Sequence, residues 1–444
     1  MDPGTGNAGE SLLSLVAVSL GIGRGLLRRA GHLTQPWVAR AGEVLDGMPQ
    51  EGMRPRFDEG RERERPPEAS LWASLQPDAL GVVLRFLPCG ADRARLRSVC
   101  RNWRAGSRGH GVPPPLPLLV LPRLRFSGLT PGGALTAARR AWMPDEVAAD
   151  NARCVGSCDE WLVCGRHVGR SCFLVNAFSH EVIHLPPLSF PDHSIYPSST
   201  PTASGWHFSM PIRKAALSAP PDSQPNWIVV ALAFSRSKPE LALWKPGMTS
   251  WHICREALIA GQIDMVFFRD KLYMLWRFTP CLFALDLKED NHGVSVSHFN
   301  DCLIERRLPK PLGAFSCNIV VWRGNLLLII RYHGGYRDRN NVTKVEVFTL
   351  DFSKNPYGVS EIHSFGGDCI FVGSGGCKSF PASMYSEVEG DLIYFGPDDC
   401  DPYDKFVYNM KDGTVRPFPV SLSLVNFGAL EDNLDFPVWL FHSE

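Results

Sequence analysis

The spacing of apolar residues changes character along this chain of 444 residues. Residues 54–68, RPRFDEGRERERPPE, have no apolar face, which is typical of a solvated linker. Residues 71–104 carry apolar residues at helical spacing. After the proline-rich stretch 113–122, short β-branched and aromatic runs are bounded by Gly, Pro, Asn and Asp. The pattern therefore predicts a small helical segment followed by a long, mainly β region.

The helical segment predicts two short helices that form a hairpin. Pro77 suits the first turn of a helix, where the missing N–H of proline costs nothing, and Pro88 and Gly90 end that helix. Apolar residues at positions i, i+3, i+4 and i+7 are Leu80, Val83, Leu84 and Leu87, and then Leu96, Val99, Cys100 and Trp103. So small a unit can hardly bury a sufficient core alone, and we expect its apolar stripes to contact a partner.

The β region repeats two kinds of hairpin. The first is an apolar strand, a polar turn and a second strand, and it recurs at 172–187, 240–254, 281–299, 344–365 and 405–419. The second is a pair of alternating strands around a tight turn, and it occurs at 266–275, 320–330 and 386–395. Two hairpins per repeat make a four-stranded blade, and several such blades predict a β-propeller. The irregular spacing of the repeats leaves the number of blades open.

The composition is that of an ordinary soluble globular protein. Hydrophobic residues make up 44% and charged residues 21%, and Lys plus Arg balance Asp plus Glu at 46 each. This balance argues against a general nucleic-acid or anionic-membrane binder. We interpret the local arginines as a solvated helix face rather than a nucleic-acid contact. They are Arg93, Arg95, Arg97, Arg101, Arg104 and Arg108.

The 13 cysteines include no C-x-x-C pair. The densest group fits no common zinc spacing, and it consists of Cys154, Cys158, Cys164 and Cys172. We interpret the cysteines as small buried thiols in a reducing compartment. We expect no metal and no cofactor.

The segment HEVIH at 180–184 matches the H-E-x-x-H pattern of zinc hydrolases, which requires a helix so that both histidines reach one metal. Here Val182 and Ile183 favour a strand, and Pro186 and Pro187 follow at once and prevent a helix. We therefore predict the returning strand of a hairpin and no catalytic zinc.

Two other segments carry partial motifs. GSGGCKS at 373–379 lacks the lysine that follows glycine in a phosphate-binding loop, which favours a propeller turn. DDCDPYD at 398–404 lacks the glycine and the terminal glutamate of an EF-hand, which favours a solvated loop.

The first residues include an apolar, uncharged segment at 11–23. It is shorter than the about 20 residues that span a bilayer, and Asp2 and Glu10 before it argue against a secretory signal. Arg24, Arg28 and Arg29 after it leave an organelle-targeting or amphipathic segment open. We expect residues 1–69 to be a poorly ordered extension and linker, no membrane association, and a location in the cytoplasm or nucleus.

Residues 71–104 resemble an F-box, and the plant version in particular. They match W-x-x-L-x-P-D-x-L-x-x-V-L, then a short Pro/Gly break, then A-D-R-x-R-x-R-x-V-C-R-x-W-R. Gln76 and Ala79 stand where the family usually has proline and leucine. The resemblance implies docking on the Skp-type adaptor of a cullin-based ubiquitin ligase. The residues that it places at or under that contact are Leu75, Pro77, Leu80, Leu84, Leu87, Val99 and Trp103.

The region 115–444 resembles the KIB-type propeller domain, which was long catalogued in plants as a domain of unknown function. In that family the propeller lies directly behind an F-box, as here. The segments that carry the resemblance, in family order, are 153–163, 173–186, 264–275, 345–352, 368–373 and 390–395.

Together these observations predict a mainly β protein with three parts. Residues 1–69 are the extension and linker, 70–110 an all-α F-box hairpin, and 111–444 an irregular β-propeller. The resemblances imply a non-catalytic substrate receptor of a Skp–cullin–F-box ligase, whose propeller loops bind an unidentified target protein. The alternatives are an interaction scaffold with a degenerate F-box, and an enzyme, either a zinc hydrolase or a propeller oxidase.

Overall fold

A computed structural model describes residues 75–442 with internal gaps. The gaps are residues 86, 88–92, 94–95, 108–109, 111–114, 122, 131–134, 137–138, 141–151, 167–170, 189–211, 236–237, 255–262, 278–280, 291–292, 305–314, 335–341, 386–387, 397–405 and 418–436. The predictions for the extension and linker, for Pro88 and Gly90, and for the acidic segment 398–404 lie outside the described residues. The chain divides into two compact units, Met1–Val112 and Pro113–Glu444.

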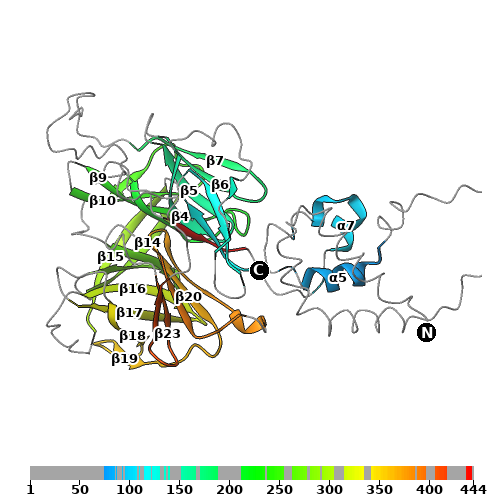
Figure 1. Cartoon of the computed structure of the whole chain (residues 1–444). Helices are drawn as coiled ribbons and strands as arrows, with labels where there is room; N and C mark the ends of the chain where they lie inside the picture. Colours follow the sequence, from blue (N-terminus) through cyan, green and yellow to red (C-terminus); the bar gives the residue numbers. More distant parts are fainter. Residues whose placement is uncertain are drawn as a thin grey trace, which may run out of the picture. The chain divides into compact units, whose positions relative to one another are not determined.

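The described part of the first unit contains two helices, α5 (Pro77–Arg85) and α7 (Arg101–Gly106), which Figure 1 draws in blue. Leu96 to Ser98 are also helical, but the helical conformation is interrupted at Val99 and Cys100 before α7 begins. The apolar stripe from Leu96 to Trp103 is thus interrupted. No helix in the described residues is long and apolar enough to cross a membrane.

The second unit is a β-propeller of six sheets, which we number as blades in chain order. Blade 1 contains β1 (Leu118–Leu121), β2 (Arg125–Gly128), β3 (Arg139–Arg140) and β25 (Val438–Leu440). Blade 2 contains β4 (Ala152–Cys158), β5 (Trp161–Arg166), β6 (Cys172–Asn176) and β7 (Val182–Leu185). Blade 3 contains β8 (Ile212–Leu217), β9 (Val229–Ser235), β10 (Lys238–Trp244) and β11 (His252–Cys254).

The remaining three blades follow the same plan, with one addition. Blade 4 contains β12 (Ile263–Phe268), β13 (Lys271–Trp276), β14 (Leu282–Asp290) and β15 (Gly293–Cys302). Blade 5 contains β16 (Phe315–Trp322), β17 (Asn325–His333), β18 (Val342–Asp351) and β19 (Gly358–Glu361). Blade 6 contains β20 (Cys369–Gly373), β21 (Gly376–Phe380), β22 (Leu392–Phe395), β23 (Phe406–Asn409) and β24 (Val415–Pro417), with the 3₁₀ turn η1 (Ala382–Met384) between β21 and β22.

The innermost strands β25, β4, β8, β12, β16 and β21 contact one another in that order and close a ring. The C-terminal strand β25 completes blade 1 by pairing antiparallel with β1, so that Leu119 lies opposite Trp439. Figure 1 draws this strand in red beside β4. Each seam between neighbouring blades encloses its own cluster of buried apolar side chains. The hydrophobic core of the propeller is therefore distributed around the ring.

The structure confirms all five predicted hairpins of the first kind. They are the outer hairpins β6–β7, β10–β11, β14–β15, β18–β19 and β23–β24. Two hairpins of the second kind are also confirmed as inner hairpins, β12–β13 and β16–β17. Arg269 and Asp270 turn the first with φ angles of 48° and 60°, as a two-residue type I′ turn requires.

The third predicted inner hairpin, at 386–395, is wrong. β22 pairs in parallel with β20 and antiparallel with β23, and β21 occupies the innermost position. Residues before β22 instead bond to the segment that precedes β20: the Asp391 amide donates to Asp368 O at 2.8 Å. A Cβ on Gly390 would lie 2.3 Å from Gly367 O. Because β20 lies beside β22, the segment that contains Gly390 does not form the turn of a hairpin.

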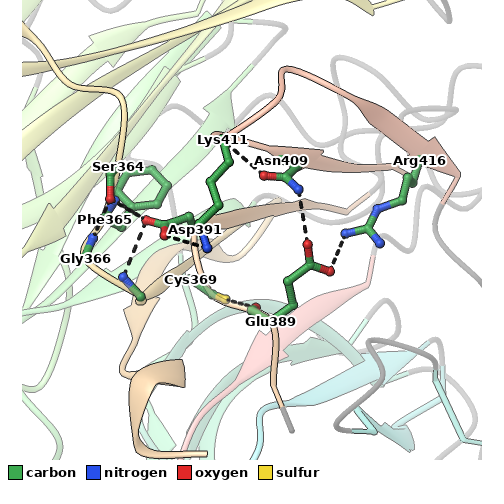
Figure 2. Close-up of polar contacts among 10 residues, drawn as sticks. Ser364, Phe365, Gly366, Cys369, Glu389, Asp391, Asn409, Lys411 and Arg416 are labelled. Carbon is green, nitrogen blue, oxygen red and sulfur yellow. Dashed lines mark hydrogen bonds and ion pairs between the residues drawn. The ribbon is translucent and has the colours of Figure 1, made fainter. Parts of the chain in front are cut away.

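Figure 2 shows the polar contacts that fix this arrangement. The Asp391 carboxylate accepts hydrogen bonds from the Phe365 amide at 2.5 Å and from Ser364 Oγ at 2.9 Å. Burial disfavours the charged form, but these bonds outweigh it and lower the pKa of Asp391. Glu389 accepts from Asn409 and Arg416, which belong to β23 and β24. The segment 389–391 thus connects the loop before β20 with the two outer strands of blade 6.

Candidate protein-interaction site

Helix α5 follows from its sequence. Pro77 begins it, Asp78 lies in the first turn and Arg85 in the last, where each charge complements the helix dipole. Leu80 and Leu84 lie one turn apart on one face, and both are fully buried. The helix therefore has one apolar face that packs within its own unit.

Helix α7 begins at a cysteine cap. Cys100 has an extended backbone (φ −157°), and its Sγ accepts a hydrogen bond from the Trp103 amide at 3.4 Å. This cap starts a new helix and leaves Val99 before it, outside the helical face. Trp103, in the first turn of α7, is buried. The interruption between Val99 and α7 explains why Val99 is exposed while Trp103 is buried.

The two helices pack closely because of glycine. A Cβ on Gly106 would lie 2.9 Å from Leu80 Cδ1, so the end of α7 lies directly on α5. The ring of His110 packs against Gly81, and its Nε2 lies 2.7 Å from Gly106 O. Sequence analysis did not single out His110. Its two partners are glycines, and a glycine carries no side chain that would mark it as a packing partner.

The described arginines of the predicted solvated face divide into two kinds, and Arg95 and Arg108 lie outside the described residues. Arg97, Arg101 and Arg104 are exposed, as a solvated face predicts. Arg93 is buried, and its Nε donates to Leu87 O at 2.6 Å. For Arg93 the interpretation as part of a solvated face is therefore wrong, because this side chain caps a carbonyl of the preceding segment.

The seven residues implied as adaptor contacts differ in exposure. Leu80, Leu84 and Trp103 form the buried core of the unit together with Leu96. Leu75 and Leu87 are partly buried against that core, and Pro77 and Val99 are exposed. Val82, which sequence analysis did not single out, is 47% exposed, as is Val99. The side chains available to a partner are thus those of the exposed residues Val82, Val99 and Pro77. The partly buried Leu75 and Leu87 add to them.

In the propeller, a buried polar cluster lies among the inner strands. Asp264 on β12 is fully buried and accepts from Lys214 Nζ on β8 at 2.6 Å. Asn318 Nδ2 and the Ile319 amide, both on β16, donate to Asp264 Oδ2 at 3.0 Å. Cys377 Sγ on β21 donates to the same oxygen at 3.4 Å. One carboxylate therefore bonds to three of the neighbouring inner strands.

The charges of this cluster suit a structural role. Burial disfavours the Lys214 ammonium, but Asp264 outweighs it and raises the pKa of Lys214. Burial disfavours the Asp264 carboxylate, but Lys214 outweighs it and lowers the pKa of Asp264. Burial and Asp264 raise the pKa of the Cys377 thiol well above its usual value. All three groups keep one protonation state near neutral pH, so they offer no acid–base pair.

In blades 2 to 5 the turns within the inner and outer hairpins lie at one end of the propeller, and polar contacts there join different blades. Trp161 Nε1 donates to Asp222 at 3.2 Å, from blade 2 to blade 3. Arg269 donates to Gly324 O at 3.3 Å, and Arg323 pairs with Asp368 at 2.7 Å, from blade 4 to 5 and from blade 5 to 6. Because the strands of blades 2 to 5 alternate in direction, the connections between their hairpins and between these blades leave from the opposite end.

The sequence motif HEVIH lies in a hairpin. His180 is in the turn with a φ of 65°, and His184 lies on β7 opposite Phe173 of β6. The predicted returning strand is confirmed as β7, which begins at Val182 and ends at Leu185. The described residues contain no group of three or more His, Cys, Asp or Glu side chains that could hold a metal. The segment GSGGCKS forms the β20–β21 hairpin, with Gly373 opposite Gly376.

The described cysteines are all free thiols. Burial raises the pKa of Cys172 and Cys317 to about 12, so these two thiols are poor nucleophiles at neutral pH. Five of the described cysteines are partly exposed, namely Cys100, Cys154, Cys158, Cys281 and Cys377. The interpretation as small buried thiols is thus confirmed for the other six described cysteines and not for these five.

Two comparisons with known proteins bear on identity. No curated protein matches the chain. The model of the KIB1-4 beta-propeller family matches residues 132–409, which lie between β2 and the end of β23. A propeller of this kind, with a distributed core and blade-to-blade contacts at one end, is suited to protein–protein interaction. The chain belongs to the KIB1-4 beta-propeller family.

Proposed function

We propose that this chain is the substrate-recognition subunit of a Skp–cullin–F-box ubiquitin ligase. The observation that carries the proposal is the order of two modules. A helical unit with the ending V-C-R-x-W-R at Val99–Arg104 directly precedes a KIB1-4 beta-propeller. The helical unit would bind a Skp-type adaptor and, through it, the cullin, while the propeller would bind a target protein.

The exposure of the helical unit supports this division of work. Among the residues that the structure describes, its core contains four buried apolar side chains, Leu80, Leu84, Leu96 and Trp103, which is small for an independent domain. Val82 and Val99 remain about half exposed beside it. Burying each valine against an apolar partner would contribute about 1 kcal/mol or more. A bound adaptor would therefore supply the missing apolar contact.

The proposed mechanism is proximity. A receptor raises the effective concentration of target lysines near the conjugating enzyme and forms or breaks no bond itself. The inter-blade contacts of Arg269 and Arg323 stiffen the scaffold that would present the target-binding loops, and loops on rigid scaffolds commonly carry specificity. The identity of the target does not follow from the fold.

Adaptor pull-down with surface variants tests the proposal. Val82→Asp and Val99→Asp place a charge on exposed positions of the helical unit, so the unit stays folded while an apolar contact is lost. Leu303→Asp is the matched control, because Leu303 is 63% exposed on the propeller. We expect the wild type and the control to retain a Skp-type adaptor, and the two valine variants to lose it.

The outcomes separate the candidate functions. A wild-type chain that ignores the adaptor contradicts the ligase proposal and favours an interaction scaffold with a degenerate F-box. Stoichiometric zinc or copper in the purified protein would instead favour an enzyme. Equal binding by all four proteins would show that the adaptor does not contact the valines.

A further inference from the structure

Two cysteines of blade 2 lie directly opposite each other on neighbouring strands. Cys154 on β4 pairs with Cys164 on β5 in an antiparallel ladder, and the register shift of that ladder lies beyond this pair, between Cys154 and Gly156. Residues opposite each other in such a ladder have Cα atoms about 4.5–5.5 Å apart, which is within the range of about 4.4–6.8 Å that a disulfide spans. In the described strand pairs no other two cysteines are opposite each other. The backbone spacing therefore suits a disulfide between them.

Both side chains face the same seam, the one between blades 1 and 2. Cys164 is a buried member of the apolar cluster in this seam, and Cys154 is partly buried against it. Successive side chains of a strand point to opposite faces of the sheet. The adjacent residues Val155 and Val163 accordingly belong to the cluster on the other face, between blades 2 and 3. The two thiols thus point to the same side of the sheet.

Cys154 is the accessible member of the pair. It is partly exposed, whereas Cys164 is buried. The Cys154 thiol donates a hydrogen bond to Gly156 O at 3.3 Å, but a thiol is a weak donor, so this bond opposes oxidation little. Redox-sensitive cysteines combine an accessible thiol with a second, resolving cysteine beside it. Cys154 and Cys164 have this arrangement.

Cys158 provides the comparison on the same strand. It is partly exposed as well, but the residue opposite it is Trp161. Burial raises the pKa of the Cys158 thiol to about 12, which leaves little reactive thiolate at neutral pH. Cys158 is therefore a matched control for Cys154.

The strand that carries Cys154 is one of the two at which the ring closes. β4 contacts the C-terminal strand β25 on one side and β8 on the other. Val438 and Leu440 of β25 belong to the same seam cluster as Cys164. A covalent bond between β4 and β5 therefore ties a closing strand of the ring to the interior of blade 2.

We propose that Cys154 and Cys164 form a reversible disulfide when the protein meets a peroxide. The Cys154 thiolate attacks hydrogen peroxide and takes one oxygen, so that a sulfenic acid forms, and the second oxygen leaves as hydroxide, which becomes water with the proton that Cys154 released. The Cys164 sulfur then attacks the sulfenic sulfur, the S–S bond forms, and the sulfenic oxygen leaves as a second water. Two thiols thus lose two electrons, and one hydrogen peroxide is reduced to two waters. A dithiol reductant reverses the reaction by exchange.

The disulfide makes the propeller more resistant to unfolding. It closes the loop of residues 155–163 in the unfolded chain as well as in the folded one. A loop closed in the unfolded chain lowers the conformational entropy of that state, which favours the folded state. The proposal does not depend on the ligase function.

Peptide mapping of the full chain tests the bond. The folded protein is treated with hydrogen peroxide, its remaining thiols are alkylated, and it is digested without reductant. Trypsin cleaves after Arg153 and Arg166 and releases residues 154–166 as one peptide. A second cleavage before Asp159 divides that peptide into two halves, and these stay together only through a disulfide that involves Cys164.

We expect linked halves in the oxidised wild type, with the alkylated cysteine of the first half being Cys158. Linked halves are also expected in Cys158→Ser, and separate halves in Cys154→Ser and after treatment with dithiothreitol. Circular dichroism checks that both variants are folded. Separate halves in the oxidised wild type overturn the proposal, and so does a linkage that persists in Cys154→Ser.

Urea unfolding tests the effect of the bond on stability. The midpoint of the oxidised wild type should lie at a higher urea concentration than that of the reduced wild type, and dithiothreitol should return it. Peroxide should not raise the midpoint of Cys154→Ser. A linked wild type that unfolds at the same urea concentration as the reduced protein overturns the proposed stabilisation.

Discussion

Lys214 and Asp264 form an ion pair of 2.6 Å between the inner strands of blades 3 and 4. Asp264 is fully buried and Lys214 nearly so. Asn318 and Ile319 of blade 5 and Cys377 of blade 6 donate to the same carboxylate. A single side chain thus joins four of the six inner strands, and its loss affects the ring rather than one blade.

Removing one partner of this pair should strongly destabilise the propeller. Lys214→Ala leaves the Asp264 carboxylate buried without its main counter-charge, and we expect a loss of about 3–5 kcal/mol in the free energy of unfolding. Urea unfolding followed by tryptophan fluorescence measures this loss. The control is Lys354→Ala, which breaks the exposed pair with Asp351 and should cost less than about 1 kcal/mol. Equal losses in the two variants would show that the buried pair of Lys214 and Asp264 stabilises the propeller no more than an exposed ion pair does.

The same pair predicts a pH dependence. The pKa of Asp264 is lowered from its usual value of 3.8, so its contribution to stability is complete above that value and is lost as the pH falls through the lower folded pKa. Asp264→Asn should therefore destabilise the protein at neutral pH. The difference in stability between this variant and the wild type should become smaller in acid. Thermal unfolding as a function of pH measures that difference. A difference that stays constant down to pH 2 would contradict the lowered pKa.

Gly390 should be intolerant of any side chain. A Cβ there would meet the backbone of Gly367 at 2.3 Å, and backbone atoms cannot move aside as a flexible side chain can. We expect Gly390→Ala to destabilise the protein by about 1–3 kcal/mol. Gly396 is the matched control in the same blade, because a Cβ there would lie 3.5 Å from its nearest neighbours. If Gly396→Ala unfolds at the same denaturant concentration as Gly390→Ala, close packing at Gly390 is not the reason.

Removing residues 437–444 should open the ring. Without β25, blade 1 loses the strand that pairs with β1, and the bond from Ser157 Oγ to Trp439 O at 2.6 Å is also lost. We expect a broadened unfolding transition at lower temperature, measured by calorimetry, and a tendency to aggregate through the exposed edge of β1. Removal of residues 443–444 alone should leave the transition unchanged. A sharp, wild-type transition after the longer deletion would exclude closure by β25.

The outer hairpins could be predicted from sequence because their signals are local. In the hairpin β6–β7, for example, alternating apolar residues lie on both sides of a polar turn, and Pro186 ends the second strand. No comparable local signal shows that β22 pairs in parallel with β20. That pairing depends on Gly390 packing against Gly367, and these residues are distant in sequence.

The same limit applies to the candidate site. Helical spacing predicted that Trp103 is buried, and it also placed Val99 on the same stripe. The structure exposes Val99, because Cys100 caps a new helix between the two residues. The pair of Lys214 and Asp264 could not be predicted either, because 50 residues separate partners that only the closed ring brings together.

Calorimetric titration of the intact chain with a purified Skp-type adaptor tests the central claim most directly. The ligase account predicts saturable one-to-one binding that Val99→Asp weakens by about tenfold or more, while Leu303→Asp binds as the wild type does. The absence of binding by the wild-type chain would contradict the account. Binding that Val82→Asp and Val99→Asp leave unchanged would contradict the contact surface assigned to the helical unit.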